Sequence, residues 1–424
     1  MTAKLNRPIV SSVSAAALLA VSSQAASAPQ NVAPAAAAPA TAQCVPDIAK
    51  VIAAGAVPAK AAPLPPELVA KLDAAVRSAL PQTAAPGVIV GVVTPSGTWK
   101  AAYGKADPAK GTPMTVDMHT RIGSVTKTFT GTAIMQLAEA KKLSLDDTIQ
   151  KYVPGIPNGD RITLRQLANM TSGLASYTQS SKFTDVLFSK PQTIWTPRRL
   201  LTIGVAESPL YEPGASFNYS NTNTVLLGMV IEQVTKKPVG QVLKEQIFDP
   251  LKLNNTSWPG NSTEMPTPFA QGFTLQGDFA KPDAPSNATH WNPSWGWTAG
   301  EMISDLDDLL VYARALGTGH GLLGPAAQTE RLTFPGAGGY GIGVGCSDGW
   351  FGHTGELPGY NTTVYYQTRA DIAVVVQTNS DIASGNCEEK PTLTDDPRDT
   401  ECSSPAKRVF VAVAKALDQP FSGP

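Results

Sequence analysis

The chain has 424 residues, of which 42% are hydrophobic and 16% charged, and 33 Lys and Arg face 34 Asp and Glu for a net charge of -1. This length leaves room for one large domain, or two of ordinary size, with a well-buried core. The balanced charge excludes the basic footprint of a nucleic-acid-binding protein. No apolar run approaches the roughly 20 residues that cross a bilayer, so no transmembrane segment is expected.

The first residues are typical of a secretory signal. Lys4 and Arg7 precede a mildly apolar run over residues 9–21, and small residues follow up to Ala28. This order predicts a signal peptide over residues 1–28. Cleavage near Ala25 fits this pattern as well as cleavage between Ala28 and Pro29 does. We therefore expect an exported protein of the periplasm, the cell envelope or the medium.

The next segment, residues 29–66, is more than half Ala and Pro. Such a composition predicts a semi-extended linker. The four cysteines of an exported chain predict two disulfides, for which three pairings are possible. Cys387 and Cys402 flank one polar loop, so we favour this pair, which leaves Cys44 with Cys346.

Apolar periodicity predicts the elements of the first three quarters of the chain. The spacing of Leu68, Leu72, Val76 and Leu80 predicts an amphipathic helix. Two apolar runs around a Pro-Ser-Gly turn then predict paired strands, over residues 87–93 and 99–103. Helical stripes follow from Phe129 to about residue 141, over 226–235 and over 304–316.

The last part of the chain has a different character. Residues 340–344 alternate with glycine as in a strand, 361–367 and 372–377 are rich in β-forming residues, and 409–417 read as a closing helix. We therefore predict an α+β fold over residues 67–424. Residues 67–129 and 331–424 would build an antiparallel sheet of the five-stranded type flanked by helices, and 130–330 would form an inserted, mainly helical part.

Several patterns exclude other chemistries. Gly336 to Gly341 matches the dinucleotide pattern G-x-G-x-x-G, but a strand-like alternation follows it where that fingerprint needs a helix. The four histidines lack metal-ligand spacing, and the chain has no G-x-S-x-G nucleophile elbow. We expect neither a metal nor an organic cofactor.

Ser124-Val125-Thr126-Lys127 is an S-x-x-K sequence at the start of a predicted helix. A serine in the first turn lies where the helix dipole favours developing negative charge. Lys127 lies one turn further on the same face and can reach the Ser124 hydroxyl. A second copy, Ser404 to Lys407, has Pro405 at the first helical position, and we interpret Ser404 as a structural helix cap.

Two further segments carry suitable chemistry. Tyr219-Ser220-Asn221 places a phenol, whose pKa a neighbouring ammonium would lower into the range of a base, beside an amide that can hold a substrate carbonyl. His353-Thr354-Gly355 lies on a predicted strand, where Gly355 would let a substrate approach the backbone and the N–H of Glu356.

With these three motifs in this order, the sequence resembles the penicillin-recognising serine hydrolases. The resemblance is to the branch of class C β-lactamases and secreted Streptomyces-type D-alanyl-D-alanine carboxypeptidases, and it covers about residues 67–420. Residues 164–174, 213–228 and 352–359 also fit the pattern of that branch. The resemblance implies the β-lactamase/DD-peptidase fold.

The resemblance further implies a mechanism. Ser124 would attack an amide or ester carbonyl, Lys127 and Tyr219 would relay its proton, and water would hydrolyse the acyl-enzyme. The backbone N–H groups of Ser124 and Glu356 would form the oxyanion hole. The substrate-binding residues would be Asn221, His353, Thr354 and Gly355.

Family membership leaves the substrate open, because one scaffold hosts carboxypeptidases, β-lactamases, esterases and D-amino-acid amidases. Our leading expectation is hydrolysis of D-Ala-D-Ala-like peptides or β-lactams by a monomer. An esterase, a weak β-lactamase, or a penicillin- or muropeptide-binding module without turnover are the alternatives. Residues 341–345 carry no arginine to bind a substrate carboxylate, which weakens the case for a carboxypeptidase. His353 replaces the lysine of efficient β-lactamases, which weakens the case for that activity.

Overall fold

The computed structural model describes residues 44–54, 62–281, 284–333, 339–387 and 400–423. The predicted signal peptide lies outside these ranges, and so do residues 29–43 and 55–61 of the predicted linker. The helices are α1 (Ile48–Ala54), α2 (Pro66–Ala79), α3 (Thr126–Glu139), α4 (Leu164–Ala168), α5 (Ser181–Ser189), α6 (Pro197–Ala206), α7 (Asn221–Thr235), α8 (Val239–Leu243), α9 (Asp249–Leu251), α10 (Leu306–Thr318), α11 (Pro325–Leu332) and α12 (Pro405–Ala416).

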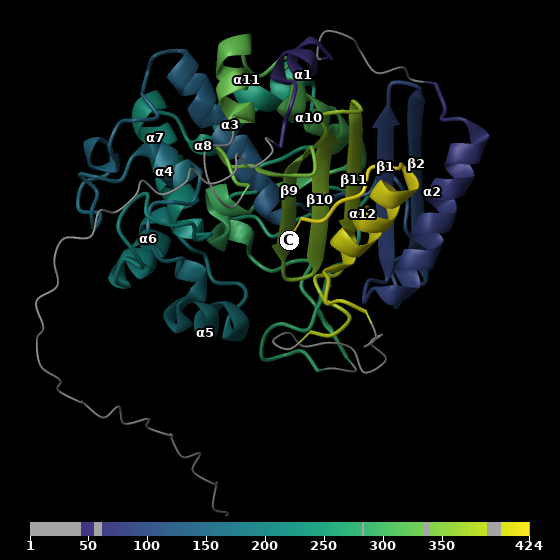
Figure 1. Cartoon of the computed structure of the whole chain (residues 1–424). Coiled ribbons are helices and arrows are strands. Elements are labelled where there is room, and N and C mark those ends of the chain that lie inside the picture. The colour runs from purple at the N-terminus through teal and green to yellow at the C-terminus, as the bar shows by residue number, and fades with distance from the viewer. Residues whose placement is uncertain (1–43, 55–61, 282–283, 334–338, 388–399, 424) are drawn as a thin grey trace, which may run out of the picture. The chain divides into compact units, whose positions relative to one another are not determined.

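The strands are β1 (Gly87–Thr94), β2 (Gly97–Asp107), β3 (Thr112–Pro113), β4 (Thr120–Arg121), β5 (Phe273–Thr274), β6 (Ser286–Asn287), β7 (Ile303–Ser304), β8 (Gly345–Ser347), β9 (Trp350–Leu357), β10 (Tyr360–Gln367) and β11 (Ile372–Thr378). The main sheet has the order β3-β2-β1-β11-β10-β9-β8, and each of its neighbouring pairs is antiparallel. Strands from both ends of the chain thus meet at the β1–β11 pair, as predicted (Figure 1).

Helices cover both faces of this sheet (Figure 1). On β1, Val88, Val90 and Val92 face the cluster formed with α2 and α12, whereas Ile89 faces the larger cluster that contains α3 and α10. Because both faces are buried, the neighbouring strands β1 and β11 are nearly continuous apolar runs with little polar alternation. Gly91 makes this packing possible, since a Cβ there would lie 2.6 Å from the Leu310 side chain on α10.

Helix α3 passes through the centre of the larger cluster and is buried around most of its circumference. Its threonines satisfy their hydroxyls locally, as when Thr132 Oγ1 donates to the carbonyl of Thr128 at 2.7 Å. The Phe129 ring stacks on Tyr312 of α10 with the ring centroids 3.6 Å apart. The helix that begins beside Ser124 is therefore fixed in a dry, low-dielectric environment.

Three expectations need correction. Within the predicted linker, residues 48–54 form α1, because Val51 is buried against the main core and α1 packs on α10 and α11. Residues 340–344 form a turn rather than a strand, since Gly343 adopts a φ of +68° and packs against the carbonyl of Lys127. Ser404 is at the N-cap of α12, but its side chain makes no capping hydrogen bond.

Two disulfides join Cys44 to Cys346 and Cys387 to Cys402, which confirms the favoured pairing. Disulfides are typical of proteins that fold outside the cytoplasm. Within the described ranges, none of the helices combines the length and the apolar character that crossing a bilayer requires.

Removing the Cys44–Cys346 disulfide should lower the free energy of unfolding by about 2–4 kcal/mol. The bond links residues 302 positions apart and ties the segment before α1 to β8, so its loss frees a long loop of the unfolded chain. Urea unfolding of the Cys44→Ser/Cys346→Ser variant measures the change. The Cys387→Ser/Cys402→Ser variant is the control, because its loop spans only 15 positions. An equal or larger loss in the control would contradict this account.

Candidate active site

Ser124 lies in the 3-10 turn Gly123–Val125 that leads directly into α3, and its side chain is partly exposed. The turn requires glycine at its first position, because Gly123 has a φ of +51° and a Cβ there would lie 2.6 Å from the backbone nitrogen of Glu356. The turn is thereby pressed against β9. This contact places the Ser124 hydroxyl at the boundary between the sheet and the helical part.

Lys127 is the second residue of α3 and lies one turn after Ser124. Its side chain is fully buried, and its amine is hydrogen-bonded to the hydroxyl of Ser124. The Nζ atom lies 2.9 Å from Ser124 Oγ and 2.8 Å from the backbone carbonyl of Ala299. Burial lowers the pKa of Lys127 well below its usual value of 10.5. The side chain is therefore suited to act as a neutral amine that accepts a proton from the serine.

Tyr219 lies beside this pair. The Lys127 Nζ is 4.9 Å from the centroid of its ring, and the Tyr219 side chain is hydrogen-bonded to Ser124. Burial raises the pKa of Tyr219, and the hydrogen bond to Ser124 only partly opposes that rise. The expectation of a lowered phenol pKa is therefore wrong, because the buried Lys127 favours its uncharged form. A protonated Tyr219 can instead pass a proton to a leaving group.

The segment that contains α4 holds Tyr219 in place. The Asn218 N–H donates to the carbonyl of Met170 at 3.0 Å, and Ser220 Oγ donates to that of Ala175 at 3.1 Å. The Gly214 N–H donates to Thr171 at 2.8 Å at the other end of the same loop. The residue that carries the phenol is thus fixed on both sides by backbone contacts.

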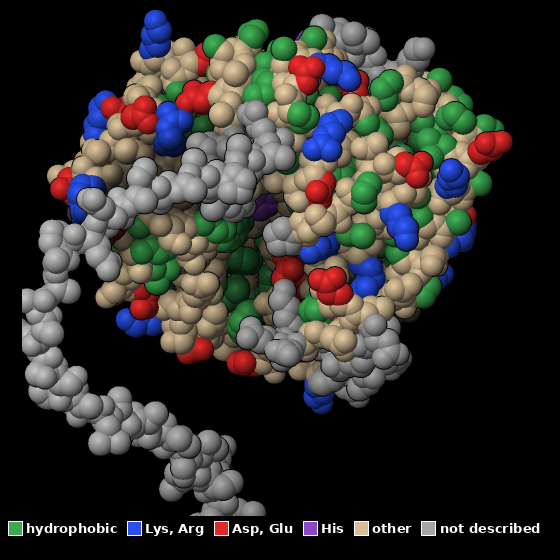
Figure 2. Space-filling view, in the orientation of Figure 1, with side chains coloured by type: hydrophobic (Ala, Val, Ile, Leu, Met, Phe, Trp, Pro, Cys, Tyr) green, Lys and Arg blue, Asp and Glu red, His purple; other side chains and the backbone are tan. Residues whose placement is uncertain are grey.

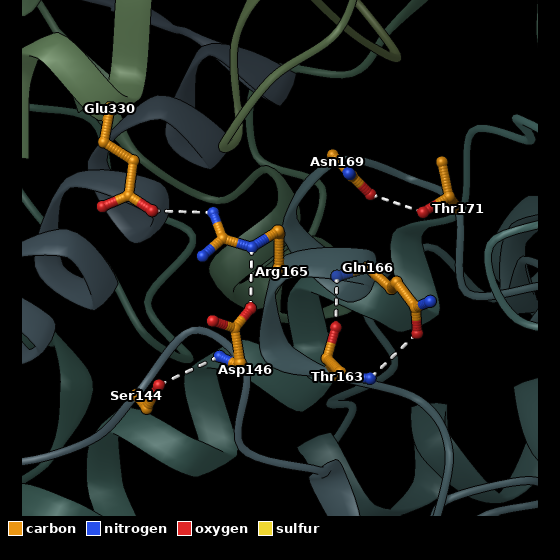
Figure 3. Close-up of polar contacts among 8 residues, drawn as sticks. All are labelled: Ser144, Asp146, Thr163, Arg165, Gln166, Asn169, Thr171 and Glu330. Atoms are coloured by element: carbon orange, nitrogen blue, oxygen red, sulfur yellow. Dashed lines mark hydrogen bonds and ion pairs between the residues drawn. The ribbon is translucent and has the colours of Figure 1, made fainter. Parts of the chain in front are cut away.

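Figure 3 shows how α4 is itself anchored. A capping box starts the helix, in which the Thr163 hydroxyl accepts from the Gln166 N–H and the Gln166 side chain accepts from the Thr163 N–H. Arg165 then bridges Asp146 at 2.9 Å and Glu330 of α11 at 2.7 Å. These surface ion pairs contribute little energy singly, but together they join three parts of the helical region around the Tyr219 loop.

Asn221 is the first residue of α7, with its side chain on the cleft beside Ser124. Its backbone N–H donates to Ser176 Oγ at 3.1 Å, and its Nδ2 donates to Thr178 Oγ1 at 3.0 Å. The hydrogen bond to Thr178 therefore fixes the orientation of the Asn221 side-chain amide. This arrangement suits the predicted role of holding a substrate amide.

His353 is buried on β9 on the other side of Tyr219, with the two ring centroids 6.1 Å apart. Its Nε2 lies 2.9 Å from the hydroxyl of Tyr340, and its Nδ1 bonds the carbonyl of Thr354. Burial lowers the pKa of His353 to about 3. His353 is therefore a neutral imidazole, which supplies no positive charge to a substrate.

Tyr340 also belongs to this site but was not predicted, because it lies in the glycine-rich stretch that matches a nucleotide loop. Its ring meets that of Tyr219 edge-on with the centroids 6.0 Å apart, and it also contacts Phe217. The only available signal was a single aromatic residue among glycines shortly before His353. The Ala299 carbonyl that holds Lys127 was also not predicted, because a backbone acceptor leaves no residue pattern.

Gly355 and Glu356 of β9 lie directly against the turn that carries Ser124. A Cβ at Gly355 would lie 1.9 Å from the carbonyl oxygen of Ile122 and 3.2 Å from the nitrogen of Ser124. Glycine is thus the residue that lets β9 approach the nucleophile. The proximity suits the predicted oxyanion hole of the Ser124 and Glu356 N–H groups.

Substituting Gly355 with alanine should lower kcat/KM by about 100-fold, the effect typical of a lost oxyanion donor. The new methyl group collides with backbone atoms, so the turn and β9 must move apart. Gly345→Ala on neighbouring β8 is a matched control, since its Cβ would find no atom closer than 3.6 Å. Steady-state kinetics on both variants test this, and an unchanged rate in Gly355→Ala would refute the role given to the close approach.

Two cavities adjoin these residues. One, of about 230 Å³, is reached by Ser124, Asn221 and Glu356, and apolar side chains dominate the rest of its wall: Phe183, Leu187, Phe188, Trp295, Leu357 and Pro358. The other, of about 270 Å³, is lined by residues that include Tyr219, Tyr340, His353 and Thr354. Figure 2 shows a hollow in this face of the molecule with hydrophobic side chains along its walls.

No lysine or arginine lines either cavity in the part of the chain that the structure describes. Across the same ranges, no three side chains of His, Cys, Asp or Glu come together as a metal site would require. Between two partly apolar cavities lie a serine hydroxyl, a buried amine and a phenol, an arrangement like that of serine hydrolases.

Comparison with known proteins places this site in a family. The Beta-lactamase family profile matches residues 69–394, and the chain belongs to that family. The fold and the family expected from the sequence are thereby confirmed, including the antiparallel sheet flanked by helices.

Among solved structures, the chain is similar to a D-stereospecific amidohydrolase from Streptomyces sp., with 33% identity and a TM-score of 0.66 over 73% of this chain and 94% of that one. It is also similar to the D-amino acid amidase of Ochrobactrum anthropi SV3 in complex with L-phenylalanine amide, with 25% identity and a TM-score of 0.69 over 83% and 99%.

Among curated proteins, the chain is 26% identical over 261 residues to the putative penicillin-binding protein PbpX of Bacillus subtilis. It is 30% identical over 212 residues to protein flp of Staphylococcus aureus. These matches cover 61% and 49% of this chain, and they span 61% and 40% of the length of the two relatives.

Proposed function

We propose that this protein is an exported serine hydrolase that cleaves amides of D-amino acids with aromatic or aliphatic side chains, through an acyl-enzyme on Ser124. The observation that carries this proposal is the cleft beside Ser124, whose wall combines an apolar cluster with Glu356 and, among the described residues, holds no lysine or arginine. An apolar wall favours a hydrophobic side chain, and a cleft without a cation disfavours a substrate that ends in a carboxylate.

In this mechanism the neutral amine of Lys127 takes the proton of Ser124 as the hydroxyl attacks the substrate carbonyl. The backbone N–H groups of Ser124 and Glu356 would stabilise the oxyanion. Tyr219, protonated at neutral pH, would donate a proton to the departing amine. Water would then hydrolyse the acyl-enzyme by the reverse sequence of proton transfers.

Similarity to a D-stereospecific amidohydrolase and a D-amino acid amidase supports an amide substrate of D configuration. The penicillin-binding relatives support the second candidate, a carboxypeptidase for D-Ala-D-Ala-like peptides. Thr354, which lines the same cavity as His353, is the residue that could contact a substrate carboxylate. The two candidates differ in one respect, the charge at the end of the substrate.

The test compares D-phenylalanine amide, L-phenylalanine amide and a D-Ala-D-Ala peptide under the same conditions. We expect kcat/KM for the D-amide to exceed that for the peptide by at least about tenfold, a difference of about 1.4 kcal/mol. Ser124→Ala is the control for background hydrolysis. Faster cleavage of the peptide would favour the carboxypeptidase. A stable penicillin adduct without turnover of any substrate would favour a binding module.

A further inference from the structure

The hydrogen bond between His353 and the Thr354 carbonyl fixes where the imidazole carries its proton, and so decides which way the Tyr340 hydroxyl is bonded. His353 Nδ1 bonds the backbone carbonyl of Thr354, and a carbonyl only accepts hydrogen bonds. Nδ1 must therefore carry a hydrogen. In the neutral ring Nε2 is then an acceptor, and the Tyr340 hydroxyl, 2.9 Å away, donates to it.

The groups around His353 favour this neutral form. Lys127 on α3 lies near His353. Tyr219, Tyr340 and Tyr365 line the same cavity as the imidazole ring. Each of these tyrosines has a pKa that burial raises, so each is a neutral phenol. Among the residues that the structure describes, the titratable groups near His353 thus include no anion to offset a positive charge, apart from Glu356 three residues further along β9.

Tyr340 is held at this place by its loop. The Gly341 N–H donates to Val344 at 2.7 Å, and the Cys346 N–H donates to Gly339 at 2.7 Å. Gly343 then packs its backbone against the carbonyl of Lys127, and its N–H donates to that of Ala168. The Tyr340 hydroxyl is therefore positioned by the same contacts that fix the start of α3.

We propose that Tyr340 is a specificity-determining residue, which donates to Nε2 of His353 and so withholds a cation from substrates that end in a carboxylate. Without the phenol, Nε2 faces the cavity with no donor and can take up a proton when an anionic substrate binds. The protein then accepts carboxylate-terminated peptides better, and most of all at acid pH. The prediction about substrate preference rests on the proposed function, whereas the prediction about the protonation of the His353 imidazole does not.

The first experiment is nitrogen NMR of protein labelled with ¹⁵N-histidine, in which His353→Gln assigns the signal. The wild type is expected to show the Nδ1–H form of His353 unchanged between about pH 5.5 and about pH 8. In Tyr340→Phe the hydrogen on Nδ1 is expected to stay bonded to the Thr354 carbonyl, and Nε2 is expected to take up a proton within that range. Tyr365→Phe, which removes a phenol from the same cavity, should keep the wild-type tautomer.

The second experiment measures kcat/KM for D-phenylalanine amide and for the dipeptide D-Phe-D-Ala. We expect the ratio of dipeptide to amide to rise about tenfold in Tyr340→Phe on going from about pH 8 to about pH 5.5, and to stay constant in Tyr365→Phe.

Several results would overturn the inference. One is a wild-type His353 that carries its proton on Nε2 or titrates in this range, a measurement that holds even if Tyr340→Phe does not fold. Another is a Tyr340→Phe variant whose imidazole stays neutral across this range and whose ratio is unchanged. If the wild type cleaves neither substrate, the proposed function fails, and the NMR result alone decides the role of Tyr340.

Discussion

The Ser124→Ala variant is expected to lose at least about 10⁴-fold in kcat/KM for the D-amide, because the attacking hydroxyl is absent. Its fold should persist, since the Ser124 side chain is partly exposed and contributes little to the core. Amide hydrolysis followed by ammonia release, together with thermal unfolding, measures both properties. A lost activity with an unchanged melting temperature assigns the effect to chemistry rather than to stability.

The second S-x-x-K sequence offers a matched control for this variant. Ser404 is at the N-cap of α12 on the opposite face of the sheet, where its side chain makes no capping bond. Ser404→Ala should therefore keep the wild-type rate and a nearly unchanged stability. Activity that survives in Ser124→Ala, or that falls equally in Ser404→Ala, would remove Ser124 from the role of nucleophile.

The Lys127→Met variant should lose about 10²–10⁴-fold in the rate of acylation, the usual contribution of a positioned general base. Methionine matches the length of the stem but has no amine to accept the proton of Ser124. Lys407→Met, in the second copy of the motif, is the control and should leave the rate unchanged. Stopped-flow measurement of the first turnover separates acylation from the later hydrolysis.

The pH dependence of the wild type tests the same base. The folded state lowers the pKa of Lys127, so the neutral amine is present at pH values where an exposed lysine is still charged. The rate should fall as the pH drops through this lowered pKa, because protonation removes the base. A rate that instead rises only around the ordinary lysine value of 10.5 would contradict a buried, neutral Lys127.

Residue patterns predicted the parts of this structure that depend on local sequence. The S-x-x-K, Y-x-N and H-T-G motifs led to Ser124, Tyr219 and His353, and the structure brings all three together. The helix over Leu68–Leu80 and the strands on either side of the turn at 95–97 were also predictable, because burial on one or both faces leaves a regular apolar pattern.

The parts that the sequence did not reveal arise from tertiary contacts. The lysine at 127 is an ordinary residue of a helix until burial removes its charge, and this burial reverses the expected effect on Tyr219. The alternation at 340–344 predicts a strand, but packing against α3 imposes a turn on this segment. The apolar wall with Phe183 and Trp295 combines segments more than a hundred residues apart.

The most direct test of the central claim is to find which residue becomes acylated. The protein is incubated with a 4-nitrophenyl ester, quenched in acid, digested and analysed by mass spectrometry, with Ser124→Ala and Lys127→Met treated in parallel. We predict an acyl group on Ser124 in the wild type, little label in Lys127→Met and none at this site in Ser124→Ala. An acyl group on another residue, or equal labelling of the wild type and Lys127→Met, would contradict a serine nucleophile activated by a buried neutral amine.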